Sequence, residues 1–222
     1  MSKTIGLIYN LALIVSLLVA TVLLAADDKP RTITFGKADD GKLPKGWTTA
    51  QTGMGTGSVW KVVEDGTAPS SAGYALSQTT EGPKESFNLC ILDGTKYTDV
   101  SFRVAFKVFS GKVDQGGGVV WRYQDPNNYY VAYYDELTAC LRFCVVVDGK
   151  RTQQAAKEGL KLNAGDWHAL QVIVEGKRVE CRLNSKKVLE AQDGTIDKPG
   201  KIGLWTKADA QTYFDDLTIR GK

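Results

Sequence analysis

The stretch GGVVWRYQDPNNYYVAYYD, residues 117–135, places a short turn signal between two runs of aromatic and β-branched residues. Such residues are typical of strands, and a Pro-Asn-Asn sequence between two strands is typical of a tight connection. If the connection is a four-residue loop, Gln124 faces Tyr129 and Trp121 lies opposite Ala132. The stretch therefore predicts an antiparallel β-hairpin in which only some of the aromatic residues belong to the core.

Side-chain alternation divides this hairpin into two faces. One face is uncharged and carries Val119, Trp121, Tyr123, Tyr130, Ala132 and Tyr134. The other face holds the charges and carries Val120, Arg122, Gln124, Tyr129, Val131, Tyr133 and Asp135. Because burying an unpaired charge is costly, the first face is predicted to be core and Trp121 to be a packing residue. The second face is a candidate binding surface.

The remainder of the chain carries the same strand and turn signals. Turn sequences such as EDG, VDGK and KPGK separate short β-rich runs that include VSFRVAFKVF, LRFCVVV, WHALQVIVEG and KIGLWT. Many short strands joined by Gly, Asp and Asn turns indicate an antiparallel β-sandwich or barrel. Residues 150–162, KRTQQAAKEGLKL, have a helix-like composition, but they follow an Asp-Gly turn and are predicted to form its return strand.

Alternation also sorts the faces of the other strands. The predicted core faces carry Phe102, Val104, Phe106, Val108, Leu170, Val172, Val174, Ile202, Leu204 and Thr206. Three residues then point to the opposite, solvent-facing side, namely Arg142, Trp205 and Lys207. Together with the charged face of the hairpin, they predict one polar and aromatic surface.

The beginning of the chain has the layout of a secretory signal peptide. Lys3 precedes an apolar run from Ile5 to Ala26, and Asp27 follows it directly. Small residues end the run, so residues 1–26 are predicted to be cleaved and the protein to be exported. An uncleaved membrane anchor is the alternative, because the run is long enough to span a bilayer. Residues 27–222 are predicted to form one domain, in the periplasm, on the cell surface or secreted.

Charge balance and cysteine content restrict the function further. The chain has 28 Lys and Arg against 25 Asp and Glu, and this near-balance without a basic stripe argues against nucleic-acid binding. The four cysteines, Cys90, Cys140, Cys144 and Cys181, leave three full disulfide connectivities open. If Cys140 and Cys144 share a strand, their Cα atoms lie about 13 Å apart, which exceeds the roughly 7 Å limit for a disulfide.

The order of several longer phrases resembles a known fold class. These phrases are GWTTAQ, SVWKVVEDGTAPSSAGYALSQ, GGVVWRYQDPNNYYVAYY, VVVDGKR, GDWHALQVIVEG and GKIGLWTKADAQTYFDDLTI. They resemble bacterial exported domains of the concanavalin A-like, LamG-like jelly-roll class. The chain is most similar to the 3-keto-disaccharide hydrolase group, related to family 16 glycoside hydrolases, roughly from Thr32 to Arg220. The resemblance implies an all-β, antiparallel jelly-roll β-sandwich and, for an enzyme, hydrolysis of 3-keto-glycosides.

The residues that would carry such an activity are changed in this chain. The E-x-D-x-x-E strand motif of family 16 glucanases is absent. Arg122 matches the Arg that ends the family's Gly-rich strand. Where the family's next strand has Glu and Gln, this chain has Tyr130 and Ala132, or Tyr129 and Val131 if the register slips, and neither register restores a carboxylate. Trp205 and Lys207 replace the polar positions of its late strand. The resemblance therefore implies the family fold with a different or lost site, and no catalytic residue is assigned.

The polar surface has the chemistry of a carbohydrate site. Aromatic rings pack against the C–H face of a sugar, and charged groups bind its hydroxyls or carboxylates. The candidate ligand-binding residues are Arg122, Tyr129, Tyr133, Asp135, Arg142, Trp205 and Lys207. Hydrolysis needs two carboxylates about 5–9 Å apart, and no such pair emerges. Non-catalytic carbohydrate binding is therefore the leading hypothesis, with a hydrolase, a protein-interaction domain or a simply solvated sheet face as alternatives.

Two further residues bear on cofactors and metals. His168, the one histidine of the chain, ends a predicted core face and is expected to be structural. Asp215 shares a face with Tyr213 and Leu217, so it is expected to be partly buried and to need hydrogen bonds or a cation. Backbone hydrogen bonding or a β-bulge is the favoured explanation, and a structural Ca²⁺ held with Asp39 or Asp40 is the alternative. No other cofactor is expected.

Overall fold

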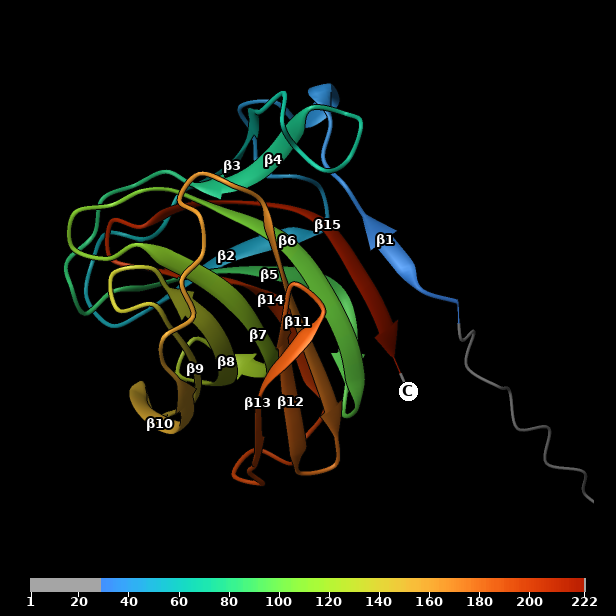
Figure 1. Ribbon diagram of the computed structural model, residues 1–222, viewed down its shortest axis with the longest axis vertical. Coiled ribbons are helices and arrows are strands. Elements are labelled where there is room, and N and C mark those ends of the chain that lie inside the picture. Colours follow the sequence, from blue (N-terminus) through green and yellow to red (C-terminus); the bar gives the residue numbers. More distant parts are fainter. Residues whose placement is uncertain (1–28, 222) are drawn as a thin grey trace, which may run out of the picture.

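A computed structural model describes residues 29–221, which form strands almost throughout and pack as two antiparallel sheets (Figure 1). The predicted signal segment, residues 1–26, lies outside the described residues. Within the described part of the chain, no helix is long and apolar enough to cross a membrane. The one helical element described there is η1 (Lys37–Asp39), a single 3-10 turn.

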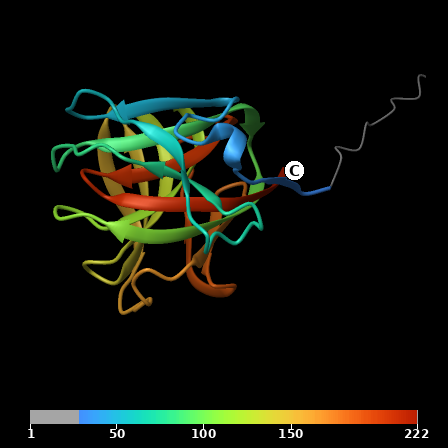
Figure 2. The same cartoon turned by 90° about the horizontal axis from the view of Figure 1, so that it is seen from above.

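The first sheet has eight strands. Its order is β13 (Lys186–Gln192), β12 (Arg178–Leu183), β11 (His168–Glu175), β6 (Val100–Ser110), β15 (Gln211–Gly221), β4 (Tyr74–Gln78) and β3 (Trp60–Glu64), and β1 (Arg31–Ile33) pairs with β15. The long strands β6 and β15 run side by side through its middle (Figure 2). Neighbouring strands far apart in the sequence give the sheet a jelly-roll connectivity.

The second sheet has seven strands. Its order is β10 (Lys150–Lys157), β9 (Cys140–Val147), β8 (Asn128–Asp135), β7 (Gly116–Asp125), β14 (Gly200–Lys207), β5 (Phe87–Tyr97) and β2 (Trp47–Thr52). The return strand expected after the Asp-Gly turn is present as β10, antiparallel to β9. The prediction of an antiparallel, concanavalin A-like jelly-roll β-sandwich is therefore confirmed.

The main core lies between the two sheets. The alternation predicted its residues correctly, because Phe102, Leu170 and Leu204 are all buried within one cluster there. Trp121 is fully buried in the same cluster, and its ring stacks on Tyr130 with 5.5 Å between centroids. The most conspicuous aromatic residue of the opening stretch is thus a packing residue.

The hairpin of β7 and β8 contains an irregularity that the sequence did not predict. Near the turn Asp125 pairs with Asn128, as a loop of the expected size requires. Further along, Trp121 pairs with Tyr130 rather than with Ala132, so β7 carries two extra residues in a bulge. A two-residue shift leaves the faces before the bulge unchanged, which is why Trp121 still points into the core.

Residues inside the bulge change sides. Arg122 has a positive φ of 46°, which breaks the alternation at this position. Tyr123 then packs on the other face of the sheet, 6.2 Å from the ring of Tyr129. The assignment of Tyr123 to the main core was therefore wrong, because alternation does not continue through a bulge.

Asp215 on β15 is fully buried, where the sequence predicted a partly buried side chain. Its carboxylate accepts a hydrogen bond from the backbone N–H of Ser70 at 2.9 Å, and a bulge follows at Asp216, where φ is 50°. Both features of the favoured explanation are present, although only Oδ2 of the carboxylate is hydrogen-bonded and Oδ1 is buried without a partner. Within residues 29–221, no group of three or more His, Cys, Asp or Glu is placed to hold a metal ion. A calcium ion at Asp215 stays a prediction.

Candidate functional site

The outer face of the seven-stranded sheet, turned away from the first sheet, is rolled into a trough. Thr52 on the edge strand β2 donates a hydrogen bond to the carbonyl of Pro126, and its hydroxyl lies 2.8 Å from that of Tyr129 on β8. Three strands separate β2 from β8, so on a flat sheet they would lie about 19 Å apart. The sheet must therefore curl until its far edge meets the β7–β8 turn.

Side chains fill the bottom of this trough as a second core. Its buried members are Leu89, Ile91, Val120, Tyr129, Val131, Tyr133, Cys144, Val146 and Trp205. The rings of Tyr133 and Trp205 lie 4.5 Å apart. They meet across Gly118, which pairs with both residues and places no side chain between them.

The predicted exposure of this face is wrong for its aromatic residues. Tyr129 and Trp205 are 0% exposed, and Tyr133 is nearly so. Burial raises the pKa of Tyr129 to about 12, and burial likewise raises the pKa of Tyr133. The physical reason is the curl of the sheet, which removes from water a face that strand alternation alone leaves open.

Arg122 is not part of the trough. It is 4% exposed and donates hydrogen bonds to the carbonyls of Thr98, Gly176 and Ile196, at 3.1, 2.6 and 2.7 Å. Asp99 lies 3.7 Å from its guanidinium. The placement of Arg122 on a ligand-facing surface was wrong, because the bulge turns its side chain toward three loops that it joins.

The mouth of the trough is a hollow of about 450 Å³, which we call the Arg151 hollow. It is lined by Gly53, Lys84, Glu85, Phe87, Gly149, Arg151 and Lys207. The Arg151 guanidinium covers the aromatic floor, 4.8 Å from the ring centroid of Phe87, 5.3 Å from that of Tyr133 and 6.0 Å from that of Trp205. Its Nη1 atom is buried without a hydrogen-bond partner.

A buried ion pair adjoins the hollow. Lys207 Nζ lies 2.8 Å from Asp114 Oδ2, and Asp114 is only 6% exposed. Burial raises the pKa of the Asp114 carboxyl above its ordinary value, although Lys207 opposes this shift. The other carboxylate oxygen, Oδ1, is buried and has no hydrogen-bond partner.

Asp209 holds the loop that carries Asp114. Its carboxylate accepts hydrogen bonds from the backbone N–H groups of Lys112, Val113 and Asp114, at distances between 2.7 and 3.2 Å. Burial opposes the negative charge of Asp209, but these three donors outweigh it and hold the pKa of the carboxyl below its ordinary value.

Asp135 and Arg142 also lie on this face. Arg142 Nη1 donates to Asp135 Oδ2 at 2.9 Å, and Thr138 donates to the same oxygen at 2.7 Å. Tyr133 and Arg142 are direct cross-strand partners. The structure therefore brings Tyr133, Asp135, Arg142, Trp205 and Lys207 to one face, as predicted, with Tyr129 buried beneath it.

Three residues of this region were not predicted, namely Phe87, Asp114 and Arg151. The turn after β9 contains a signal for Arg151, because pairing across it sets Lys150 opposite Val147 and Arg151 opposite Val146. Counting outward from the Asp-Gly turn would therefore have placed Arg151 on the face of Val146. Asp114 lies in an irregular loop, where alternation gives no direction.

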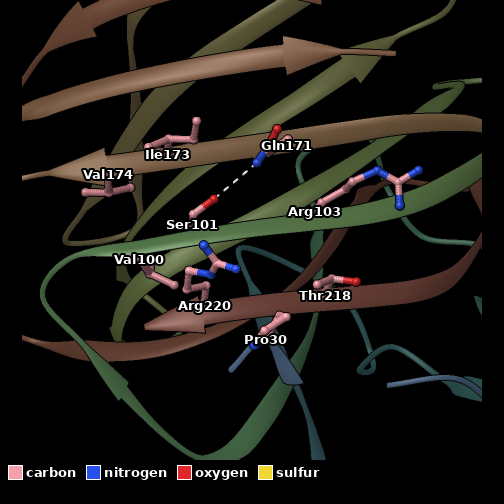
Figure 3. A pocket seen from close by; sticks show the side chains of 9 residues that line it. All are labelled: Pro30, Val100, Ser101, Arg103, Gln171, Ile173, Val174, Thr218 and Arg220. Atoms are coloured by element: carbon pink, nitrogen blue, oxygen red, sulfur yellow. Dashed lines mark hydrogen bonds between the residues drawn. The ribbon is translucent and has the colours of Figure 1, made fainter. Parts of the chain in front are cut away.

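A second hollow, of about 390 Å³, lies on the outer side of the eight-stranded sheet (Figure 3). Its polar side chains already have partners, because Gln171 donates to Ser101 at 3.1 Å and Arg103 donates to Asp216 at 3.0 Å. Its lining includes no aromatic ring on which a ligand could stack. The Arg151 hollow is therefore the stronger candidate site.

Comparison with known proteins agrees with this architecture. A family model described as a 3-keto-alpha-glucoside-1,2-lyase-like domain matches residues 34–220. No curated protein is similar enough in sequence to count as a relative.

Three solved structures share the fold. The carbohydrate-binding module CBM66 from Bacillus subtilis has a TM-score of 0.64 and 19% identity, over 79% of this chain and 96% of the module. A Bacillus subtilis protein of unknown function with a galectin-like fold has a TM-score of 0.54 and 13% identity, over 73% of this chain and 89% of its own. A native glycosidic hydrolase has a TM-score of 0.51 and 13% identity, covering 88% and 97%. At these identities the likeness establishes the fold.

Proposed function

Because the chain belongs to the 3-keto-alpha-glucoside-1,2-lyase-like domain family, we propose that it is an exported protein that binds a carbohydrate in the Arg151 hollow without transforming it. Export rests on the signal-like sequence of residues 1–26. A carbohydrate ligand is supported by the family and by the fold that the chain shares with a carbohydrate-binding module. The location of the site and binding without catalysis are argued from the site itself, because one fold serves many functions.

The observation that carries the proposal is the Arg151 guanidinium lying over three aromatic rings at the mouth of the trough. Phe87 is only partly buried, so its ring can offer an apolar surface to the C–H face of a sugar. Arg151, Lys84 and Lys207 line the same hollow and can donate hydrogen bonds to hydroxyl or carboxylate oxygens. A platform beside charged donors suits one face of a sugar ring.

The carboxylates near the hollow support binding rather than catalysis. Asp114 is paired with Lys207, and Asp135 is paired with Arg142. General acid–base work by a carboxyl group requires it to reach the substrate and to exchange a proton with it. In each pair one carboxylate oxygen is engaged by a cation of the protein and is therefore not available to a substrate.

Affinity electrophoresis and a glycan array test the proposal. We expect the wild-type protein to be retarded by at least one glycan and the Phe87→Ala variant to bind it about fivefold more weakly or worse, since stacking on one ring contributes roughly 1 kcal/mol or more. Phe109→Ala is the matched control, because Phe109 is 58% exposed on β6 of the other sheet. Absence of any glycan ligand, or equal losses in both variants, would refute a carbohydrate site in the hollow.

An enzyme of the family type is the second candidate function. The observation in its favour is Asp114, a buried carboxyl whose pKa is raised by burial and whose Oδ1 atom has no partner. Such a group is suited to donate a proton, as general acids with raised pKa values do. Release of sugar from 3-keto-glycosides, with divalent metal supplied, would establish this function, and an Asp114→Asn variant should then lose the activity. No turnover under these conditions would exclude it.

A further inference from the structure

The Arg151 hollow carries an excess of positive charge. Three of the residues that line it, Lys84, Arg151 and Lys207, are cations. Glu85 is the one carboxylate in this lining. Lys207 is partly neutralised by Asp114. Among the described residues, no carboxylate forms an ion pair with Lys84 or with Arg151. Two cations at one opening are therefore left without a carboxylate partner in the described part of the chain.

The surroundings of Arg151 strengthen its field. The guanidinium lies against Phe87, Tyr133 and Trp205, and its Nη1 atom has neither solvent contact nor a hydrogen-bond acceptor. The rings stabilise the cation through their π faces but do not cancel its charge. Apolar walls also lower the local dielectric, so a charge at the mouth of the hollow attracts an anion more strongly than one on open surface.

The hydrogen-bonding capacity of the hollow points in the same direction. Lys and Arg side chains donate hydrogen bonds and accept none. A neutral sugar presents hydroxyls, which must both donate and accept, and such a ligand needs acceptors in the site. A carboxylate or sulfate only accepts, and the planar guanidinium can bind it with two parallel hydrogen bonds. Donors thus dominate the lining of the Arg151 hollow, which matches an anionic group better than a neutral one.

We propose that the Arg151 hollow selects an anionic saccharide, in which a carboxylate or sulfate group is bound by Arg151 and Lys84 while a neighbouring sugar ring packs against Phe87. This inference rests on the proposed carbohydrate-binding function and adds the charge of the ligand to it. The partly exposed Phe87 ring provides the packing surface beside the cations.

Titration calorimetry with three tetrasaccharides tests the inference: an oligogalacturonate, a sulfated galactan fragment and the neutral maltotetraose. We expect at least one of the two anionic tetramers to bind about tenfold or more tightly than the neutral one. We also expect that affinity to fall when NaCl is raised from about 0.05 M to about 0.5 M, because salt screens partly exposed charges.

Charge-removing variants locate the effect. In Arg151→Met the side chain still covers the rings, and in Lys84→Gln the side chain is shortened by little, so both are expected to fold. Each should weaken binding of the anionic tetramer about two- to fivefold, the effect of losing one partly exposed ion pair. Lys186→Gln removes the same charge from an exposed position on β13 of the other sheet and should leave the affinity unchanged.

The outcomes separate the two proposals. Equal, salt-independent binding of maltotetraose and both anionic tetramers would overturn the anionic selectivity and leave carbohydrate binding intact. Binding of an anionic tetramer that Lys186→Gln weakens as much as Arg151→Met would also overturn it, because the attraction would then be a property of the whole surface. Failure of all three tetramers and of every glycan on the array would refute the carbohydrate site itself.

Discussion

Arg122 shows how one residue can stabilise several connections at once. Its guanidinium donates to carbonyls in the β5–β6, β11–β12 and β13–β14 connections, at Thr98, Gly176 and Ile196. These loops belong to both sheets, so one side chain holds together the end of the sandwich at which they meet. A positive φ at Arg122 makes this possible, because it directs the side chain away from the trough.

The first prediction concerns Arg122→Met. The substitution leaves three carbonyls without their donor, and each such loss costs about 1–3 kcal/mol when the group is buried. We therefore expect the free energy of unfolding, measured by urea denaturation, to fall by roughly 3–5 kcal/mol. Glycan affinity of the folded variant should be unchanged. A stable Arg122→Met protein that has lost its ligand would show instead that Arg122 is a binding residue.

The second prediction is a pH dependence that Asp209 produces. The pKa of Asp209 is lower in the folded protein than its ordinary value of 3.8. A lowered pKa stabilises the fold above the unfolded-state value, and this stabilisation is lost as the pH falls through the folded-state value. Asp209→Asn should therefore lower the free energy of unfolding by about 1 kcal/mol at neutral pH, since one amide oxygen replaces a charged acceptor of three N–H groups.

The stability gap between wild type and Asp209→Asn should begin to narrow as the pH falls below about 4, where Asp209 of the unfolded chain takes up a proton, and should vanish only below the lowered folded-state pKa of Asp209. Urea titrations of both proteins between neutral pH and about pH 3 measure this gap. A gap that is independent of pH would mean that the charge of Asp209 does not hold the Lys112–Asp114 backbone.

At the scale of the element, β7 is shaped by three consecutive glycines, Gly116 to Gly118. A Cβ atom at Gly117 would lie 2.7 Å from Phe214 of the facing sheet. A Cβ atom at Gly118 would lie 2.5 Å from the Cα and Cβ atoms of Tyr133. The strand can therefore lie this close to its neighbours only without side chains, and both cores depend on it.

The third prediction concerns Gly118→Ala. The added methyl group must displace β8 or separate Tyr133 from Trp205, and overpacking of this kind costs about 1–3 kcal/mol. Thermal unfolding followed by tryptophan fluorescence measures the effect, because Trp205 lies at the affected contact. Gly66→Ala is the control, since a Cβ atom there meets nothing within 4 Å. Similar unfolding temperatures for the two variants would contradict the close packing over Gly118.

At the scale of the whole molecule, one sheet serves two cores. Its inner face packs against the eight-stranded sheet, and its outer face closes on itself as the floor of the trough. All four cysteines are free and buried among these layers. Burial raises the pKa of the Cys144 thiol to about 11 and that of Cys181 to about 12, so neither is a reactive thiolate near neutral pH.

The fourth prediction follows from these thiols. Ellman's reagent at about pH 8 should label none of the four in the native protein and all four in guanidinium chloride, because only unfolding exposes them. The unfolding temperature should be the same with and without a reducing agent. Fewer than four thiols in the unfolded, unreduced protein would show that a disulfide forms.

Much of the fold followed from local sequence patterns. Alternation placed Trp121, Phe102 and Leu204 in the main core, because a strand leaves only two directions for its side chains. The same rule placed Tyr133 and Trp205 on one face of the second sheet. It did not show that this face is buried, although apolar residues on both faces of runs such as FNLCIL were a signal that both sides pack.

The sequence by itself determined the fold class, the strand faces and the composition of the polar surface, since these depend on the order of neighbouring residues. The tertiary structure alone decided how deep each residue lies. The curl that joins Thr52 to Tyr129 and the bulge at Arg122 depend on contacts between distant strands and on one backbone angle. The curl buried the aromatic rings of Tyr129, Tyr133 and Trp205, which the sequence had predicted to be exposed, and left Arg151 at the opening. The bulge removed Arg122 from this surface.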